Sequence, residues 1–298
     1  MSSPHNFITG TELKAAELHD LLRRALEMKA APNESESLRW RHVALLFEKP
    51  STRTRVSFQV GIQQLGGHAM LMRSEELQLA RGESVRDTAL VLSRYVDAIV
   101  VRHGEHAVIE ELARYADIPV VNALTPIHHP CQALADLLTL QERFGSLDGL
   151  RVGYVGDGNN VLHSLMLVGA RAGVQVAAAT PAELRPDAAL VAQAGELATV
   201  VDDPAEAAAG AHAVYTDVWV SMGDEEDAAR RRELLAPYRL DAGLLAHARE
   251  DAVVMHCLPA HPGEEITEEL LYGERSAVWD QAENRLHAQK ALMERLLA

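Results

Sequence analysis

The sequence predicts an α/β protein with two domains, each a parallel β-sheet flanked by helices. Apolar runs of strand length alternate with helical stretches almost to the C-terminus, as in parallel sheets whose strands are joined by helices. At 298 residues the chain is long enough to bury two separate cores. A break at 145–149 divides the elements into two series. We therefore place one domain at residues 1–145 and the other at 146–279, and expect a last helix at 280–298 to pack back on the first domain.

The first series opens with an amphipathic helix at about 11–30, followed by a polar link at 32–34. The pair Gly66-Gly67 closes a later helix as C-terminal glycines do. We expect strands in this series at 42–47, 68–72, 97–101 and 118–121, and helices at 53–65, 83–94, 105–115 and 130–143. In the second series we expect strands at 151–155, 174–178, 199–201, 213–216 and 252–256.

The composition limits the kinds of partner. The 28 Lys and Arg residues stand against 43 Asp and Glu, and the net charge of −15 argues against a nucleic acid or an anionic membrane as the main partner. An anionic ligand must therefore meet a local basic pocket. The hydrophobic share of 48% and the charged share of 24% are those of an ordinary globular protein.

The cysteines and the N-terminus indicate a compartment. Cys131 and Cys257 are the only cysteines, too few and too far apart in the sequence for a disulfide framework or a cysteine-rich metal site. The N-terminal residues lack a basic segment followed by an apolar one, and no apolar run approaches the ~18 residues of a membrane span. We expect a protein of the reducing cytoplasm, with neither a signal peptide nor a membrane span.

An anion-binding pattern lies where the first strand gives way to a helix. Residues 50–58 read Pro-Ser-Thr-Arg-Thr-Arg-Val-Ser-Phe directly after an apolar run. The first turn of a helix leaves backbone N–H groups unpaired and carries the positive end of the helix dipole. Arg53 and Arg55 add guanidinium groups that suit phosphate oxygens. The cluster predicts a phosphate site, although Ser51 by itself could be a helix N-cap beside solvated arginines.

Two further loops are expected at the carboxyl edge of the same sheet, where ligands gather. Arg102 directly follows a predicted strand, and the run His128-His129-Pro130-Cys131-Gln132 precedes a predicted helix. His129 and Gln132 would then point into the mouth of the sheet. Adjacent histidines also suit a metal, but no Glu or second His stands at a spacing that completes a ligand set. For Arg102 the alternative is an ordinary solvated arginine at a strand end.

Three clusters in the second half carry further polar chemistry. The turn Gly156-Asp157-Gly158-Asn159-Asn160 resembles a dinucleotide-binding turn without its third glycine, so it is weak evidence for a nicotinamide cofactor. Its asparagines could cap a helix or bind a polar ligand. Asp217, after a predicted strand, could accept the ammonium of an amino acid or cap a turn. The pair His256-Cys257 suggests a thiol nucleophile, but adjacent residues on a strand point to opposite faces, which weakens that hypothesis.

Taken together, these clusters resemble the aspartate/ornithine carbamoyltransferase family over nearly the whole chain. Residues 51–55 match its S-T-R-T-R carbamoyl-phosphate motif, and residues 129–132 match its H-P-x-Q. Residues 217–223 match the D-x-x-x-S-M-G segment of the ornithine branch, and residues 256–259 match its H-C-L-P, where the aspartate branch typically has H-P-L-P. The resemblance implies transfer of the carbamoyl group of carbamoyl phosphate to the side-chain amine of L-ornithine, giving L-citrulline and phosphate. Pro262 departs from the family, whose members commonly carry a basic residue there.

The resemblance also implies site residues, in a cleft between the two domains and at the contacts of a homotrimer. Carbamoyl phosphate is expected to bind Ser51, Thr52, Arg53, Thr54, Arg102, His129, Gln132 and Arg285, to bind Gln78 of a neighbouring subunit, and to lie beside Cys257 and Leu258. Ornithine is expected to bind Asn160, Asp217, Ser221 and Met222. The candidate catalytic residues are Arg53, Arg102, His129 and Cys257, with Cys257 a polar neighbour of the amine rather than a covalent nucleophile. No metal or organic cofactor is required.

The sequence leaves three alternatives open. The nearest is carbamoyl transfer to putrescine or an N-acylated ornithine, but Asp217 favours free ornithine because an α-ammonium needs a carboxylate. A nucleotide-dependent oxidoreductase would leave residues 51–55 and 129–132 unexplained. A non-catalytic binding protein would be expected to lack at least one of the three implied arginines, and all three are present. A role in arginine biosynthesis or in arginine breakdown is equally compatible with the sequence.

Overall fold

A computed structural model describes residues 6–32, 35–73, 78 and 82–220 and residues 225–298. The chain divides into two compact units, of which the first comprises residues 1–138 with 284–298 and the second residues 139–283. Each unit is built around a fully parallel β-sheet with helices on its faces. The predicted α/β class with two parallel sheets is therefore confirmed.

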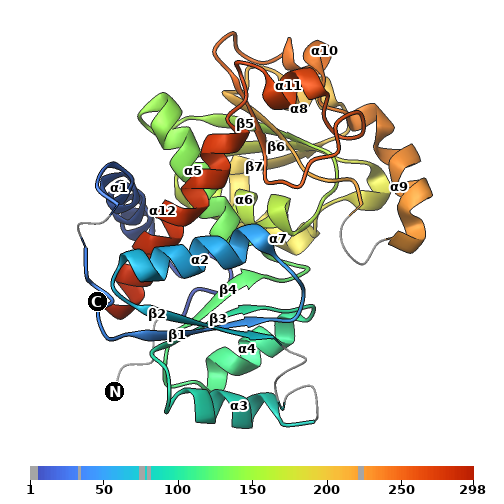
Figure 1. Ribbon diagram of the computed structural model, residues 1–298. Helices are drawn as coiled ribbons and strands as arrows, with labels where there is room; N and C mark the ends of the chain where they lie inside the picture. Colours follow the sequence, from blue (N-terminus) through green and yellow to red (C-terminus); the bar gives the residue numbers. More distant parts are fainter. Residues whose placement is uncertain (1–5, 33–34, 74–77, 79–81, 221–224) are drawn as a thin grey trace. The chain divides into compact units, whose positions relative to one another are not determined.

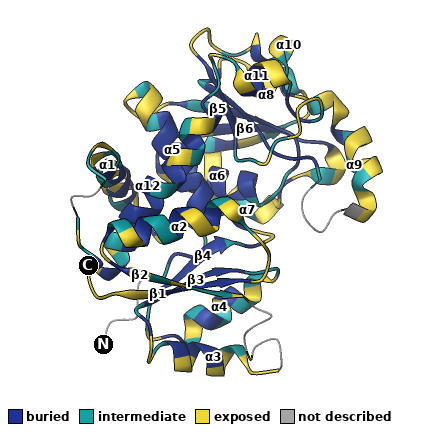
Figure 2. Cartoon of the chain, in the orientation of Figure 1, coloured by how far each residue is buried: buried dark blue, intermediate teal, exposed yellow. Residues whose placement is uncertain are grey.

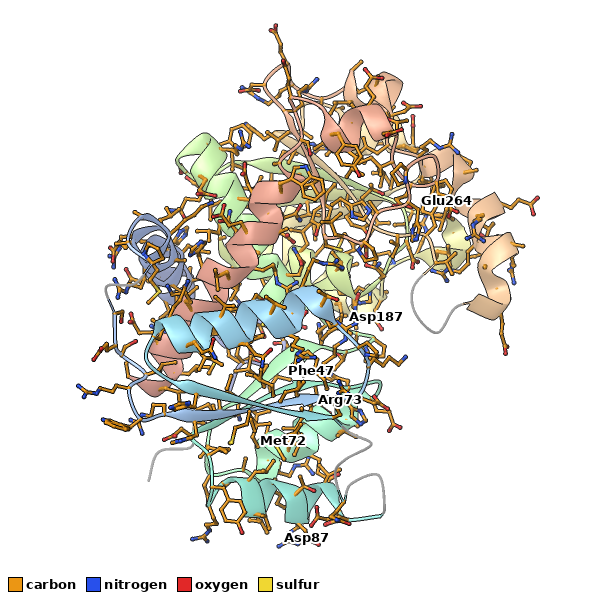
Figure 3. All side chains as sticks on the ribbon, viewed as in Figure 1. Phe47, Met72, Arg73, Asp87, Asp187 and Glu264 are labelled. Carbon is orange, nitrogen blue, oxygen red and sulfur yellow. The ribbon has the colours of Figure 1, made fainter. Side chains whose placement is uncertain are left out.

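The sheet of the first unit has four parallel strands in the order β2-β1-β3-β4. Their bounds are β1 His42–Phe47, β2 His68–Arg73, β3 Ala98–Arg102 and β4 Val120–Leu124. Phe47, the last residue of β1, pairs in register with Arg73 of β2 on one side and Arg102 of β3 on the other. Figure 3 labels Phe47 and Arg73 at this shared edge. Because the strands are parallel, the loops that follow them all emerge at the edge formed by the carboxyl ends of the strands.

Helices cover both faces of this sheet. Figure 1 shows α2 on one side of the sheet and α3 and α4 on the other. The helices of the unit are α1 Ala15–Ala30, α2 Thr52–Gln64, α3 Val85–Leu92 and α4 His106–Tyr115, and α5 Pro130–Phe144 and α12 Val278–Leu297 each lie partly in it. Strands β1 and β3 are buried almost throughout, as expected where both faces are covered. The edge strand β2 alternates between exposed and half-buried residues.

The sheet of the second unit has five parallel strands in the order β7-β6-β5-β8-β9. Their bounds are β5 Arg151–Val155, β6 Gln175–Ala179, β7 Ala198–Val201, β8 Ala213–Thr216 and β9 Val253–His256. The strand order reverses between β5 and β8, and the crevice at such a switch point is where ligands bind in open α/β sheets. Val155, Thr216 and His256 are in register at this edge, so the polar residues that follow them emerge side by side.

The second sheet is also covered on both faces. Figure 1 shows α6 and α7 on one side of it and α8, α10 and α11 on the other. Gly153 of β5 makes the close approach of α8 possible, since a Cβ there would lie 2.6 Å from the carbonyl oxygen of Ala207. The helices are α6 Asn160–Arg171, α7 Ala188–Ala194, α8 Pro204–Ala208, α9 Ala228–Leu235, α10 Ala242–Leu245 and α11 Glu268–Tyr272, with single 3-10 turns at 182–184, 195–197, 225–227 and 236–238.

Burial follows the sheets. Figure 2 shows buried residues along the strands and exposed residues on the outward faces of the helices. Among the described residues, no helix combines the length and the apolar character that crossing a membrane would need. Among the apolar side chains at the surface, Met70 of the edge strand β2 is 39% exposed and Tyr95 is 74% exposed, and both line one surface hollow.

Candidate active site

The first unit carries a cationic half-site at the carboxyl ends of its strands. Ser51 occupies the N-cap position of α2, but its side chain makes no capping hydrogen bond, so the N-cap alternative does not account for it. The backbone N–H groups of the first helical turn are the usual partners of an anion. Arg102 ends β3, and the run 128–132 joins β4 to α5. The three predicted loops thus lie at one edge of the sheet.

Arg285 joins the separate motifs of this half-site. Its Nη1 donates to the Oε1 of Gln132 at 2.7 Å, and its Nη2 donates to the Oγ1 of Thr54 at 3.2 Å. The amide of Gln132 in turn donates from Nε2 to Oδ1 of Asp136 at 2.8 Å. Thr54, Gln132 and Arg285 are all at most 3% exposed. Residues 231 positions apart in the sequence therefore form one buried polar network.

The guanidinium groups act on one another electrostatically. Burial first, and then the charges of Arg285 and Arg53, lower the pKa of Arg102 from its usual 12.5 to about 10. Within the described part of the chain, the buried Nε of Arg102 has no hydrogen-bond partner. Arg102 and Arg285 are buried and Arg53 is half-buried, so a multiply charged anion that enters beside these three cations is stabilised. The arrangement therefore fits a phosphate-containing ligand.

His129 lies within the field of these three arginines. Burial, followed by the charges of Arg285, Arg102 and Arg53, holds the pKa of His129 well below its ordinary 6.5. The imidazole is thus neutral at physiological pH, with one ring nitrogen that donates and one that accepts. A neutral donor can stabilise negative charge that develops on a carbonyl oxygen without itself changing charge.

The neighbouring Cys131 is structural. Its thiol donates to the carbonyl oxygen of Asn122 at 3.4 Å, and burial raises its pKa to about 12. A thiol of that pKa supplies almost no thiolate at neutral pH, so it is a poor nucleophile. The adjacent His128 packs its ring edge-on against His106, with centroids 5.1 Å apart.

Three predicted site residues take no part in the described geometry. Gln78 is exposed, and the neighbouring residues 74–77 and 79–81 lie outside the described residues. Ser221 and Met222 also lie outside them. Their predicted roles remain predictions.

The second unit carries a half-site centred on Asp217, which follows β8 and is 4% exposed. Its Oδ2 accepts from the Nδ2 of Asn159 at 2.8 Å, and its Oδ1 accepts from the thiol of Cys257 at 2.9 Å. Asn159 is also the N-cap of α6, where its Oδ1 accepts from the backbone N–H of Val161 at 2.9 Å. Asn160, the predicted ligand, is the first residue of α6 at the same edge. A carboxylate has about four acceptor positions, so Asp217 can still accept an ammonium group.

His256 and Cys257 do not form a catalytic dyad. The Nδ1 of His256 accepts from the backbone N–H of Leu258 at 2.8 Å, which places the proton of the neutral ring on Nε2. Nε2 lies 3.1 Å from Oε1 of the fully buried Glu265, to which it donates. The thiol of Cys257 is directed to Asp217 instead. The imidazole therefore has no free nitrogen with which to deprotonate the thiol.

The same geometry bears on metal binding. Asp217, His256 and Cys257 offer ligand atoms within 4.8 Å of one another, which is the one such group found among the described residues. Both ring nitrogens of His256 are already engaged, by Leu258 and Glu265. Only a carboxylate and a thiol remain, fewer than the three or four protein ligands of a zinc site.

The glycine turn after β5 serves packing. A Cβ on Gly158 would lie 2.3 Å from the nitrogen of Pro186 and 2.4 Å from the carbonyl oxygen of Leu184. The backbone N–H of Gly158 donates to that same oxygen at 2.8 Å. The backbone that approaches this glycine is therefore the protein's own, whereas in a dinucleotide site it is the pyrophosphate that approaches. The turn gives no support to the oxidoreductase alternative.

A buried ion pair holds the chain that follows Asp217. Arg231 of α9 pairs with Asp157 of the glycine turn, and its Nε donates to the carbonyl oxygen of Trp219 at 2.9 Å. Both charged side chains are at most 14% exposed. Glu264, labelled in Figure 3, pairs with the adjacent Arg232 at 3.0 Å. These contacts fix the segments on both sides of residues 221–224.

Sequence reasoning missed several residues of the two networks. Asp136 stands four residues after Gln132 in a predicted helix, and that spacing could have identified it. The sequence gives Asn159 and Asn160 the same interpretation, and the hydrogen bond from Asn159 to Asp217 is visible only in three dimensions. No signal in the sequence singles out Glu265.

Comparisons with known proteins agree with this geometry. The carbamoyl-P binding domain of the aspartate/ornithine carbamoyltransferase family matches residues 5–142, and the Asp/Orn binding domain of that family matches residues 148–296. The ornithine carbamoyltransferase of Methanoculleus marisnigri is 52% identical over 299 residues, covering 98% of this chain and 97% of the relative. That of Acidothermus cellulolyticus is 53% identical over 300 residues, covering 98% and 96%.

Solved structures give the same result. The ornithine carbamoyltransferase of Thermus thermophilus is similar with a TM-score of 0.92 and 45% identity, covering 100% of both chains. That of Pyrococcus furiosus has a TM-score of 0.93 and 44% identity, covering 98% of this chain and 96% of the other. With both domains of one family matched in order and half of the residues shared with its members, this chain belongs to the aspartate/ornithine carbamoyltransferase family.

Proposed function

We propose that this protein is an enzyme that transfers the carbamoyl group of carbamoyl phosphate to the side-chain amine of L-ornithine, giving L-citrulline and phosphate. The observation that carries this function is the positive charge that Arg53 and Arg285 exert on Arg102, and that all three arginines exert on a neutral His129, within a chain of net charge −15. The relatives and structural neighbours reported above are named ornithine carbamoyltransferases, which supports the same reaction.

In this proposal the first unit binds the donor. Ser51, Thr52 and the first turn of α2 hold the phosphate, and Gln132 with Arg285 holds the carbamoyl group. Attack on the carbonyl builds negative charge first on its oxygen and then on the departing phosphate. Arg53, Thr54, Arg102 and His129 stabilise that charge, and each such donor is typically worth ~3 kcal/mol of barrier.

The second unit binds the acceptor. Asp217 accepts the α-ammonium of ornithine, and Asn160 binds its carboxylate. Ser221 and Met222 also contact this amino-acid end of ornithine. The side-chain amine must be neutral to attack, although its unperturbed pKa is roughly 10.4. Desolvation and nearby guanidinium charges favour the neutral amine. Cys257 and Leu258 lie beside the reacting groups.

The acceptor half-site favours free ornithine over the alternatives. Asp217 is buried and receives neutral donors, from Asn159 and Cys257, in the hydrogen bonds that hold it. A buried carboxylate held by neutral donors gains a strong partner in an α-ammonium. Putrescine has no α-carboxylate for Asn160, and an N-acylated ornithine has no α-ammonium for Asp217.

Assembly, compartment and pathway complete the proposal. We infer a homotrimer in which Gln78 reaches the donor site of a neighbouring subunit. Support comes from the exposed apolar side chains of Met70 and Tyr95, which line one hollow beside the edge strand β2, since such surfaces commonly mark protein contacts. Two cysteines that form no disulfide fit a reducing cytoplasm, and citrulline formation fits arginine biosynthesis.

A colorimetric citrulline assay tests the reaction. Ornithine, putrescine, N-acetylornithine and aspartate are offered side by side with carbamoyl phosphate, and we expect turnover with ornithine to exceed the others by at least a hundredfold. Arg53→Ala and His129→Ala should each lose about a hundredfold or more in kcat. Wild-type turnover by either variant at saturating substrate would refute the assigned roles.

Subunit mixing tests the position of Gln78. Trimers of Gln78→Ala and trimers of Arg53→Ala are each expected to be nearly inactive. Mixed trimers, formed by dissociation and reassociation, regain activity if one subunit's Gln78 completes another subunit's site. No recovery, in mixed trimers verified by native mass spectrometry, would show that Gln78 does not complete the site of a neighbouring subunit.

A further inference from the structure

Arg285 has a neighbour that no motif marked. Gln289 lies one turn further along α12, and its amide oxygen accepts from the Nε of Arg285 at 3.2 Å and from its Nη2 at 3.0 Å. The opposite amide orientation would set an N–H group against these two donors, so the oxygen must face the guanidinium. Gln289 is 1% exposed, which keeps water from replacing either hydrogen bond.

The amide nitrogen of Gln289 connects this side chain to α2, the helix whose first turn is proposed to bind the phosphate. It donates to the Oγ of Ser57 at 2.5 Å, and the hydroxyl of Ser57 donates to the carbonyl oxygen of Thr54 at 3.1 Å. The hydroxyl of Thr54 then accepts from the Nη2 of Arg285. Gln289 therefore closes a ring of hydrogen bonds that fixes the guanidinium of Arg285 against the first turn of α2.

The acceptors in this arrangement are neutral. Arg285 donates to the carboxamides of Gln132 and Gln289 and to the hydroxyl of Thr54. A carboxylate in the place of Gln289 would make stronger hydrogen bonds with Arg285. It would also offset the positive charge that Arg285 exerts on Arg102 and His129. Gln289 thus orients Arg285 without adding a negative charge beside it, which favours an anion in the site.

We propose that Gln289 is a positioning residue of the donor half-site, which orients Arg285 for carbamoyl phosphate through a neutral acceptor. This role rests on the proposed function, because it concerns the affinity for carbamoyl phosphate and not for ornithine. Gln289 does not touch the substrate; it acts through Arg285.

Two substitutions test separately whether Gln289 orients Arg285 and whether its acceptor must be neutral. Gln289→Met has a similar shape and removes both the acceptor and the donor. Gln289→Glu keeps an acceptor for Arg285 but adds a negative charge. We expect each to raise the KM for carbamoyl phosphate about tenfold, the usual effect of losing one hydrogen bond to a charged group, with the KM for ornithine within about twofold of wild type.

The chain offers a matched control in the next residue. Lys290 is also 1% exposed, and its Nζ donates to the carbonyl oxygen of Pro32 at 2.6 Å and to the Oε1 of Gln64 at 3.0 Å. Lys290→Met thus loosens α12 without touching Arg285. We expect it to lower Tm and to leave the KM for carbamoyl phosphate within about twofold of wild type.

The wild-type enzyme is measured first, by titration calorimetry with carbamoyl phosphate and by the citrulline assay. If it neither binds carbamoyl phosphate nor forms citrulline, the proposed function itself is wrong. If it does both and Gln289→Met retains the wild-type KM, Gln289 has no positioning role. An equal rise in KM in Lys290→Met would reduce the effect to helix packing, and a wild-type KM in Gln289→Glu would overturn the need for a neutral acceptor.

Discussion

Replacing Arg102 by methionine should make the ligand-free protein more stable and nearly inactive. The pKa of Arg102 falls from 12.5 to about 10 because burial and two neighbouring guanidinium groups oppose its charge. At 1.36 kcal/mol for each pKa unit, holding the charge in the folded state costs on the order of 3 kcal/mol. A lowered pKa of a cation means that this cost is fully present below pH 10 and is lost as the pH rises from 10 toward 12.5. At neutral pH the charge therefore destabilises the fold.

Methionine keeps the apolar stem of the side chain and removes the charge. Even if repacking takes up most of the relieved energy, a gain of ~1 kcal/mol should raise Tm by ~2–4 °C. Differential scanning calorimetry without ligand measures this, and the citrulline assay should show kcat/KM reduced by about a hundredfold or more. Phosphate should raise the Tm of the wild type by binding its folded state, and should raise the Tm of Arg102→Met much less.

Arg114→Met is the control, because Arg114 lies exposed in the last turn of α4 of the same unit. Its Tm and its activity should stay at wild-type values. A correctly folded Arg102→Met protein with a lower Tm than wild type would refute the electrostatic reasoning. Retention of wild-type kcat/KM would remove Arg102 from the site.

Three further predictions concern single side chains. Cys257→Ser keeps an O–H donor for Asp217 and should retain most of the activity, whereas Cys257→Ala should lose about tenfold; mass spectrometry that traps a carbamoylated Cys257 would contradict this. Gly158→Ala sets a Cβ 2.3 Å from the nitrogen of Pro186 and should lower the free energy of unfolding in urea by ~2 kcal/mol or more; an unchanged midpoint would show that the 184–186 segment moves freely. The ring of His129 should stay neutral from about pH 8 down to about pH 6, because its pKa lies well below 6.5. The Cε1–H resonance of His129 in the NMR spectrum, assigned by its loss in His129→Gln, measures this. A titration of that resonance between about pH 8 and about pH 6 would contradict the burial argument.

The strands were predictable because parallel strands covered on both faces must be apolar throughout. The predicted strands 42–47, 151–155 and 213–216 coincide with β1, β5 and β8. The predicted strand 118–121 was displaced, since β4 runs from Val120 to Leu124. Pro119 lacks the N–H that would start the strand earlier. Asn122 lies within the strand, where its side chain donates to the carbonyl oxygen of Ile8 at 2.8 Å.

The site was predictable as motifs and not as a network. Short helices such as α8, α10 and α11 span four or five residues, too few for a periodicity that a sequence can reveal. The pairing of Asp217 with Asn159 depends on β5 and β8 being neighbours, which the chain order does not state. Gln289 is one polar residue among several in a helix, and only its hydrogen bonds to Arg285 in the structure identify it as part of the site.

The first unit is discontinuous in sequence, with residues 139–283 inserted between its two parts. A nascent chain that has left the ribosome as far as residue 138 carries the whole four-stranded sheet and the S-T-R-T-R loop, but neither Arg285 nor Lys290. Without Arg285, the hydrogen bonds that unite Thr54 and Gln132 cannot form. During synthesis the donor half-site is therefore completed only after the entire acceptor unit has been made.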